Sequence, residues 1–276
     1  MKKAPKWMKQ LWNRTTWKKV ELDMIIQHLE NNDLRSFGDG SVREQWGAFA
    51  WCFTGKGQKR KMMIHKGAVH GHRNQMRAIR SEATYMLSVL CLLYTLQNFV
   101  TNECKVDIHT DCQGLLNKIN DRNINRPSLV TSNHIDIVYQ IRELISKLNI
   151  KINLIFTRAA PKEDPDNPPE ILPTTEELLM QEMHVLATTY YHDAKSNKPS
   201  QHSVHFPAQK ITITYAGNTI VADVANFLQN SERRLMREEY FENRMGIVPI
   251  ALEQIDQYAL ARIIQKTRSI DSRTPK

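Results

Sequence analysis

The sequence is poor in cysteine and has no pair of cysteines in a CxxC arrangement. Its four cysteines are scattered along the chain as Cys52, Cys91, Cys104 and Cys112. This pattern supports neither a disulfide framework nor a zinc site, so a reducing intracellular compartment is expected, without distinguishing nucleus from cytoplasm. Cys52 and Cys91 lie within apolar runs and are interpreted as small core residues.

Long apolar runs are also missing, as are internal repeats and low-complexity tracts. The longest apolar stretch, Tyr85 to Leu96, is amphipathic and too short to cross a membrane. The first 19 residues contain no acid but seven lysines and arginines. An organellar presequence is one interpretation, but such peptides favour arginine over lysine. We therefore expect residues 1–33 to be a basic lead-in segment.

The overall composition fits a folded, basic protein. The 276 residues are enough for two domains, and an apolar share of 41% is enough to build a core. The formal net charge is +9 and the pI is about 9.4. This excess of positive charge favours an anionic partner such as nucleic acid over a merely solvated basic surface.

Hydrophobic periodicity predicts an α/β domain. We expect three antiparallel strands, a helix, a strand, two helices, a further strand and a last helix that starts at Thr174 or Thr175. The clearest helix is expected to begin at Ser81 as N-cap, which places Glu82 in its first turn. These elements are predicted at Arg35–Ser41, Ala48–Thr54, Lys61–Val69, Ser81–Leu96, Val106–Asp111, Gln113–Ile119, His134–Leu148, Lys151–Phe156 and from Thr175 through Ala187.

Beyond the last helix, residues 195–208 are predicted to form a polar linker. Residues 34–194 would then be the main domain, and residues 209–276 a small α+β extension of unknown function. Within the extension, a hairpin is expected to turn at Ala216-Gly217 and to be followed by two helices.

Three acids occupy notable places in this order. Asp39 ends the first strand, Glu82 starts the clear helix, and Asp111 ends the strand that follows it. If the two strands are neighbours and the helix packs across them, the three carboxylates converge, which needs a cation between them. Two magnesium ions held about 4 Å apart would activate a water and stabilise the leaving oxygen in phosphodiester cleavage. Taken singly, each acid is as well explained by a turn or a helix end.

The order of these motifs resembles the ribonuclease H family, in particular the ribonuclease H segment of retroelement polyproteins. The matching pieces span about Leu34 to Tyr191 and read Ser36-Phe37-Gly38-Asp39-Gly40-Ser41, Gly47-Ala48-Phe49-Ala50-Trp51, Ser81-Glu82-Ala83 and His109-Thr110-Asp111-Cys112. The resemblance implies a mixed five-stranded sheet flanked by helices. It also implies that Asp39, Glu82 and Asp111 bind two Mg²⁺ ions, with Mn²⁺ as an alternative. The substrate implied is the RNA strand of an RNA–DNA hybrid, cut to leave 5′-phosphate and 3′-hydroxyl ends.

The sequence departs from the family at its fourth acid. Where the family has an acid at the start of its last helix, this chain has His184, which we therefore include among the catalytic positions. Histidine is a poor ligand for magnesium, because hard cations prefer oxygen. The nearest acid, Glu182, lies two residues away, about 200° around a helix, and so is expected to point elsewhere. The family's loop histidine has no clear counterpart in Arg158–Asp166.

A basic strip precedes the clear helix. Between Gly55 and Ser81 there are eight lysines and arginines and no acid. We expect this strip to flank the acids and to contact phosphates, the alternative being a solvated hairpin face. Its predicted nucleic-acid-binding residues are Lys56, Lys59, Arg60, Lys61, Arg73, Arg77 and Arg80.

Two functions remain open at this point. The first is a metal-dependent nuclease acting on RNA–DNA hybrids, and the second is a catalytically impaired hybrid-binding module of a larger retroelement polyprotein. A transposase or integrase of the same superfold is disfavoured, because those enzymes keep their essential glutamate after both aspartates. Here Glu82 lies between Asp39 and Asp111.

Overall fold

The computed structural model describes the greater part of the chain up to Val224. The described residues are 4–12, 17–71, 75–121, 133–161, 172–196, 204–209, 213–215 and 218–224, with the single positions 229, 236 and 239. The two helices predicted after residue 224 and the turn predicted at Ala216-Gly217 lie outside these residues.

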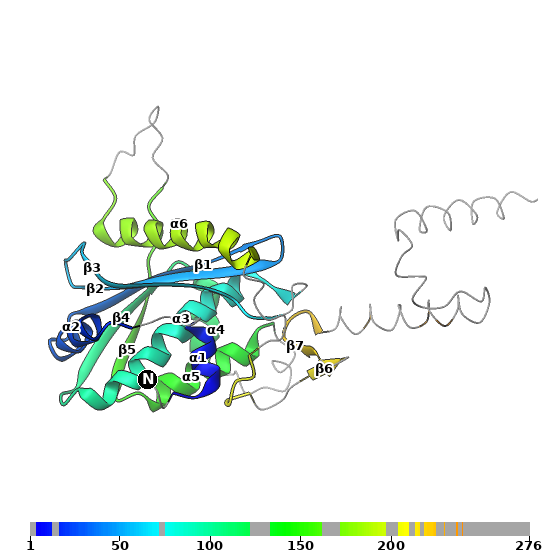
Figure 1. Cartoon of the computed structure of the whole chain (residues 1–276), viewed down its shortest axis with the longest axis horizontal. Coiled ribbons are helices and arrows are strands. Elements are labelled where there is room, and N and C mark those ends of the chain that lie inside the picture. The colour runs from blue at the N-terminus through cyan, green and yellow to red at the C-terminus, as the bar shows by residue number, and fades with distance from the viewer. Residues whose placement is uncertain are drawn as a thin grey trace, which may run out of the picture. The chain divides into compact units, whose positions relative to one another are not determined.

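The secondary structure follows the predicted order (Figure 1). The elements are α1 (Lys6–Leu11), α2 (Lys19–Glu30), β1 (Leu34–Arg43), β2 (Trp46–Gly55), β3 (Lys61–Ala68), α3 (Ala78–Leu96), the 3₁₀ turn η2 (Gln97–Phe99), β4 (Cys104–Thr110), α4 (Gln113–Asn120), α5 (Ile135–Lys147), β5 (Ile150–Phe156), α6 (Thr175–Ser196), β6 (Ile213–Tyr215) and β7 (Asn218–Ile220). The predicted strands and helices up to Phe156 are confirmed to within three residues at their ends.

A mixed five-stranded sheet organises the domain. Its strand order is β3-β2-β1-β4-β5, in which β1 pairs antiparallel with β2 and parallel with β4. The outer pairs are antiparallel for β2 with β3 and parallel for β4 with β5. The two strands predicted to carry Asp39 and Asp111 are therefore neighbours at the centre of the sheet, as expected.

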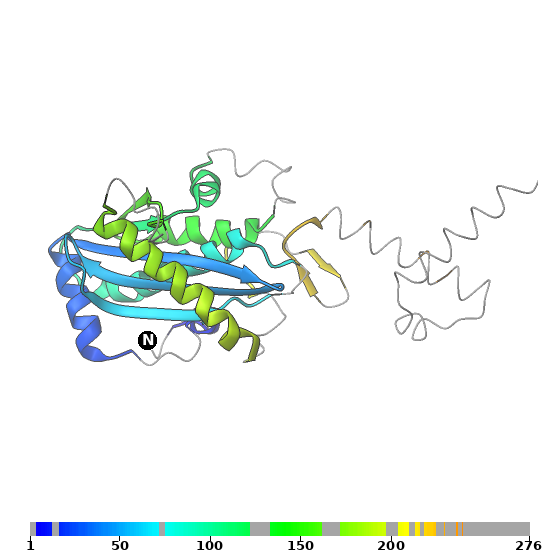
Figure 2. The ribbon, with the colours of Figure 1, turned by 90° about the horizontal axis from the view of Figure 1, so that it is seen from above.

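Helices cover both faces of the sheet. Figure 1 shows α6 on one face and α1, α3, α4 and α5 on the other, and Figure 2 shows α6 crossing the strands obliquely. The larger core lies on the α3 side and the smaller one under α6. The smaller core consists of Phe37, Ala50, Cys52, Leu179, Met180, Met183 and Ala187. This arrangement is the mixed five-stranded sheet flanked by helices that the sequence predicts.

The start of α3 corrects one prediction. The helix begins at Ala78 with Arg77 as N-cap, three residues before the expected start. Ser81 is therefore not the cap: it is a buried helical residue whose hydroxyl donates to the Ser41 carbonyl at 3.3 Å. Glu82 accordingly lies beyond the first turn of α3, so its predicted position in the first turn is wrong.

Part of the N-terminal segment is packed in the core. The prediction of residues 1–33 as a basic lead-in segment does not include this role. Met8, Leu11 and Trp12 are at most 4% exposed and join the cluster on the α3 side of the sheet. The Trp12 indole N–H donates to the Ser88 carbonyl of α3 at 3.3 Å. The apolar residues of this basic segment thus close one side of the domain.

The C-terminal part of the chain continues the same compact unit past α6. By their contacts, residues 1–223 form one unit and residues 224–276 a second. Val204 and Phe206, which fall in the predicted linker, are buried in the α3-side core. The short antiparallel pair β6 and β7 confirms the predicted hairpin strands. The division into a domain at 34–194, a linker and an extension at 209–276 stays a prediction about independent folding.

None of the helices in the described part of the chain combines the length and the apolar character that crossing a bilayer requires.

We predict that Trp12→Ala lowers the free energy of unfolding by about 3–5 kcal/mol, because it removes a buried aromatic side chain and leaves a cavity. Urea unfolding measures this change. The matched control is Val20→Ala in α2, where the side chain is 63% exposed and the change should stay within about 0.5 kcal/mol. Equal, small effects of the two substitutions would contradict the placement of the N-terminal segment in the core.

Candidate metal centre

Strand register places Asp39 and Asp111 side by side. The parallel pairing of β1 with β4 runs from Leu34 opposite Val106 to Phe37 opposite His109 and then stops. Asp39 and Asp111 each lie two residues beyond that last pair. Since side chains alternate along a strand, Asp39 projects on the same face as Phe37, and equal offsets bring Asp111 alongside it.

Two glycines allow helix α3 to approach β1. A Cβ atom on Gly38 would lie 2.3 Å from the Tyr85 ring, and one on Gly40 would lie 2.3 Å from the backbone nitrogen of Glu82. Any larger residue at either position would push the helix away. The glycines beside Asp39 thus make room for α3, which fills the space next to them.

The close approach fixes the third acid. Glu82 Oε1 accepts a hydrogen bond from the Gly40 backbone N–H at 2.9 Å. The hydroxyl of Thr110 donates to Glu82 Oε2 at 3.5 Å. The glutamate is thus held toward the gap that opens between β1 and β4 after their pairing ends.

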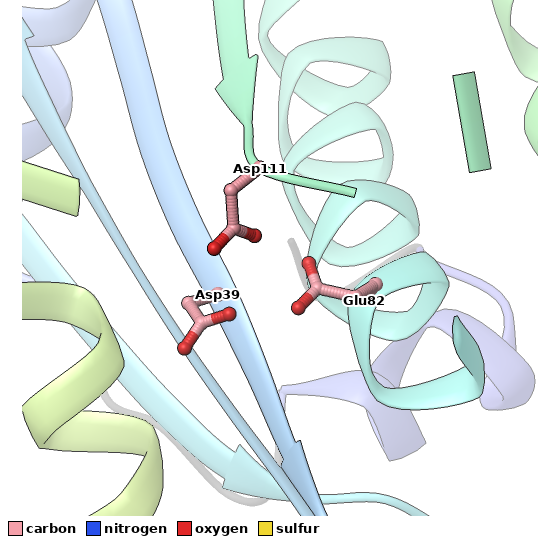
Figure 3. A group of neighbouring side chains, drawn as sticks. All are labelled: Asp39, Glu82 and Asp111. Atoms are coloured by element: carbon pink, nitrogen blue, oxygen red, sulfur yellow. The ribbon is translucent and has the colours of Figure 1, made fainter. Parts of the chain in front are cut away.

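The three carboxylates meet as predicted. Figure 3 shows Asp39 on β1, Glu82 on α3 and Asp111 just past β4, all directed to one point. One oxygen of each lies within 4.8 Å of the others. Asp39 and Glu82 are 3% and 5% exposed, and Asp111 is half-buried, so the cluster opens to solvent on the Asp111 side.

This convergence is electrostatically unfavourable without a cation. Two carboxylate charges 4.8 Å apart repel by about 3 kcal/mol at an effective dielectric constant of about 20. Burial, followed by the charge of Asp39, raises the pKa of Glu82 well above its ordinary value. Burial and Asp39 likewise raise the pKa of Asp111. Three oxygen donors in a partly desolvated pocket fit a hard divalent cation, whose charge removes this repulsion.

His184 faces the acids, as its position in the sequence predicts. Its ring Nδ1 donates to Asp39 Oδ2 at 2.7 Å, and its side chain is 44% exposed. Glu182, the nearest acid on α6, points elsewhere and forms an ion pair with Lys61. The acids at 163, 164 and 166 lie outside the described residues. Within the described chain, then, the neighbour that α6 gives the cluster is an imidazole.

The structure places the predicted phosphate-binding residues in different surroundings. Arg80 is 2% exposed and makes two 3.1 Å hydrogen bonds to the carboxylate of Asp136, so its predicted contact with nucleic acid is wrong. Lys61 is half-buried in its pair with Glu182. Arg77 remains exposed, and Arg73 lies outside the described residues.

Three exposed residues of the strip lie at the turn between β2 and β3, far from the acids. Lys56, Lys59 and Arg60 belong to the turn between β2 and β3, and the Lys56 N–H donates to the Asp33 carbonyl just before β1. Leu34 pairs with Gly55, whereas Asp39 pairs with Ala50. Five strand residues, roughly 16 Å, separate the two levels. The turn lies at the opposite end of the sheet, and the expectation that it flanks the metal site is wrong.

Sequence reasoning did not identify the residues that support the cluster. Phe37 stacks on His109 with ring centroids 4.3 Å apart, directly before the two aspartates. The Tyr85 hydroxyl donates to the His109 carbonyl at 2.9 Å, tying α3 to β4. Alternation predicts that Phe37 and Asp39 share a face, but the stacking partner depends on the strand order, which one sequence does not give.

Comparisons with known proteins find similarity at the level of structure. No protein-family model matches the chain, and no curated protein matches its sequence. An N-terminal RNase H domain from Mycobacterium tuberculosis, solved as a fusion with maltose binding protein, is 13% identical with a TM-score of 0.39, covering 60% of this chain and 97% of that one. RNase H1 from the halophilic archaeon Halobacterium salinarum is 15% identical with a TM-score of 0.31, over 45% and 84% of the two chains. LC11-RNase H1 in complex with an RNA/DNA hybrid is 9% identical with a TM-score of 0.33, also over 45% and 84%. At this identity the likeness concerns fold alone.

The electrostatics of Glu82 generate a prediction about the metal-free protein. A group whose pKa is raised on folding stabilises the folded state below its ordinary pKa, here 4.5, and that contribution is lost as the pH rises through the raised value. In EDTA at pH 7, Glu82→Gln should therefore be more stable than the wild type, because the neutral amide removes the repulsion from Asp39 and Asp111. Near pH 4 the two proteins should unfold alike.

Addition of Mg²⁺ should reverse the order at pH 7, because the ion stabilises the folded wild type by mass action and the variant lacks one ligand. Thermal unfolding in EDTA and at Mg²⁺ concentrations raised in 10-fold steps measures this reversal. The control for the loss of one negative charge is Glu143→Gln on α5, where the side chain is 43% exposed. A Glu82→Gln protein that is less stable than wild type in EDTA at pH 7 is incompatible with this account of the cluster.

Proposed function

We propose that this chain is a metal-dependent endonuclease that cuts the RNA strand of RNA–DNA hybrids. The observation that carries the proposal is the meeting of Asp39, Glu82 and Asp111 within 4.8 Å at the point where β1 and β4 separate. Strand register, the close approach of α3 at the glycines and the hydrogen bonds of Glu82 all bring the acids together. Since the charges of these acids repel one another, such an arrangement supports a cation-binding site.

Mg²⁺, or Mn²⁺ in its place, suits the donors of this cluster, which are all carboxylate oxygens. When bound, a pair of such ions supplies an activated water and charge compensation for the leaving oxygen. Asp39, Glu82 and Asp111 are the residues proposed to hold them. The formal net charge of +9 favours a polyanionic substrate over an acidic or neutral one.

The surrounding residues of this chain position the acids. The Gly40 N–H and the Thr110 hydroxyl fix the Glu82 carboxylate, so that it does not have to be ordered when substrate binds. His184 holds Asp39 Oδ2 from the α6 side. The half-buried Asp111 forms the open side of the cluster, from which a phosphodiester approaches.

A catalytically impaired hybrid-binding module is the second candidate, and His184 is the observation that favours it. A neutral imidazole adds no negative charge where a fourth acid would stand, so a second ion is held less firmly. The bond from His184 also engages one oxygen of Asp39. Origin in a retroelement polyprotein is part of both proposals and is supported by the motif resemblance between Leu34 and Tyr191.

We expect the purified protein to cleave a labelled RNA–DNA hybrid when Mg²⁺ or Mn²⁺ is added, leaving duplex DNA and duplex RNA intact. Asp39→Asn should lower the rate by at least about 100-fold, since it removes one charge from the ligand set while keeping the side-chain size. A gel assay of product lengths and ends measures both. Binding of the hybrid without any cleavage, at every metal concentration, would favour the impaired module.

The effect of His184 separates the two candidates. His184→Asp should raise metal-dependent cleavage and lower the Mg²⁺ concentration needed for half-maximal rate. The increase in melting temperature on addition of Mg²⁺ should grow in parallel, which provides a readout independent of turnover. The control is Val185→Asp, an adjacent exposed position on α6, 51% accessible, where an added acid should change neither quantity. An unchanged metal requirement in His184→Asp would show that the imidazole does not limit the site.

A further inference from the structure

A short C-terminal segment lies across the start of two helices near the acidic cluster. Val221–Asp223, here called the strap, contacts the residues that precede α3 and α5 (Figure 1). The Val221 N–H donates to Gln75 Oε1 at 2.7 Å, and the Val221 carbonyl accepts from the His134 N–H at 2.6 Å. The strap is therefore bound through its backbone to both helix starts.

The last strap residue places a carboxylate on two donors. Asp223 Oδ2 accepts from the Arg77 guanidinium at 2.6 Å, and Asp223 Oδ1 accepts from the Asn133 amide at 3.1 Å. Asn133 in turn accepts from the Asp223 N–H at 2.7 Å. A guanidinium beside an amide N–H is also the kind of donor pair that binds phosphate oxygens in nucleic-acid complexes. The Arg77 and Asp223 side chains are 48% and 35% exposed, so solvent and solutes reach the pair.

This carboxylate lies close to the proposed site. Arg77 precedes Glu82 by five residues, about 7.5 Å along the axis of α3. The start of α3 lies near Asp39, because the Gly40 N–H of the central strand β1 donates to the carboxylate of Glu82. At a rise of about 3.4 Å per nucleotide and strand, a phosphate at Arg77 lies within a few nucleotides of one at the cluster. Arg77 is an exposed cation of the predicted strip, and it lies at the start of α3, the helix that carries Glu82.

The strap and the residue that precedes α5 have locally unfavourable backbone and side-chain features. Asp223 has a φ of 50° and His134 a φ of 61°, both in the left-handed region that residues with a side chain seldom occupy. Both ring nitrogens of His134 are buried without a hydrogen-bond partner. Buried polar atoms without partners are rare and oppose the arrangement that buries them. The backbone of the strap is therefore held by its other contacts, and the Asp223 side chain is the part that a competing phosphate can replace.

We infer that Asp223 is an intramolecular competitor of a nucleic-acid phosphate for Arg77 and Asn133, and that the strap thereby attenuates substrate binding. This inference rests on the proposed nucleic-acid partner and concerns its regulation. A phosphate group displaces the carboxylate side chain from the two donors, while the apolar strap residues Val221 and Ala222, 6% and 1% exposed, stay packed. No covalent change is involved.

The test is binding of a fluorescent RNA–DNA hybrid in EDTA, where no cleavage occurs, over a series of salt concentrations. Asp223→Asn keeps the size and the amide partner but frees Arg77 from its counter-charge. Its hybrid affinity should rise about 3- to 10-fold at low salt. The slope of log affinity against log salt should steepen by about one, because one more phosphate contact releases one more counterion.

Two controls make the result specific. Glu143→Gln changes the net charge by the same amount at an ion pair near the other end of α5, and should alter affinity less than 2-fold. In an Arg77→Ala background, Asp223→Asn should give no gain. An Asp223→Asn protein that binds like Glu143→Gln, or a gain that survives loss of Arg77, overturns the strap inference.

Cleavage by the unmodified chain separates this inference from the proposed function. If the wild type cuts the hybrid but Asp223→Asn binds no tighter, the nuclease stands and the strap inference fails. If Asp223→Asn gains affinity while the wild type never cuts, the strap inference stands and the nuclease proposal fails. Absence of both cleavage and binding in either protein overturns both.

Discussion

Contact between helix α3 and strand β1 at Gly38 and Gly40 is the constraint on which the rest of the site depends. The helix lies so close to the strand that neither position has room for a Cβ atom. At this spacing the Gly40 N–H reaches the carboxylate of Glu82, and the Tyr85 hydroxyl reaches the carbonyl of His109 on the next strand. The helix therefore ties together the two strands that carry the aspartates. The distance between helix and sheet, usually set by bulky side chains, is here set by their absence.

The buried charges near this contact are of two kinds: some have a partner of opposite charge, and others do not. Arg80 and Asp136 form a buried pair with two hydrogen bonds, so that each charge has its partner. Breaking such a pair is strongly destabilising, because it leaves one charge alone out of water. Two residues further along α3, Glu82 has the acids Asp39 and Asp111 and the Gly40 backbone N–H around it. Arg80 thus stabilises the fold, whereas Glu82 retains a repulsion that a bound cation would relieve.

The sequence predicts the positions of the three acids better than it predicts the surroundings of the residues near them. Asp39, Glu82 and Asp111 are recognisable because alternation and helical periodicity, which are local properties, place each acid near the end of a strand or the start of a helix. Arg80 was assigned to nucleic acid because a run of basic residues does not show which of them finds a buried partner, and Asp136 is 56 residues away. The burial of Trp12 was missed for the same reason, since its partner Ser88 lies 76 residues along the chain. The distance of Lys56 from the acids follows only once the β1–β2 register is known.

The two cores of the domain are completed by different parts of the chain, and therefore at different times during synthesis. The three acids and most of the α3-side core are contained in the sequence up to Asp111, whereas the other sheet face is covered by Leu179, Met180, Met183 and Ala187 of α6. During synthesis, which proceeds from the N-terminus, Phe37 and Cys52 on that face emerge well before the helix that buries them. Until α6 has been made, these side chains have no helix to bury them. This face of the sheet can therefore be completed only after the chain has been extended past Ala187.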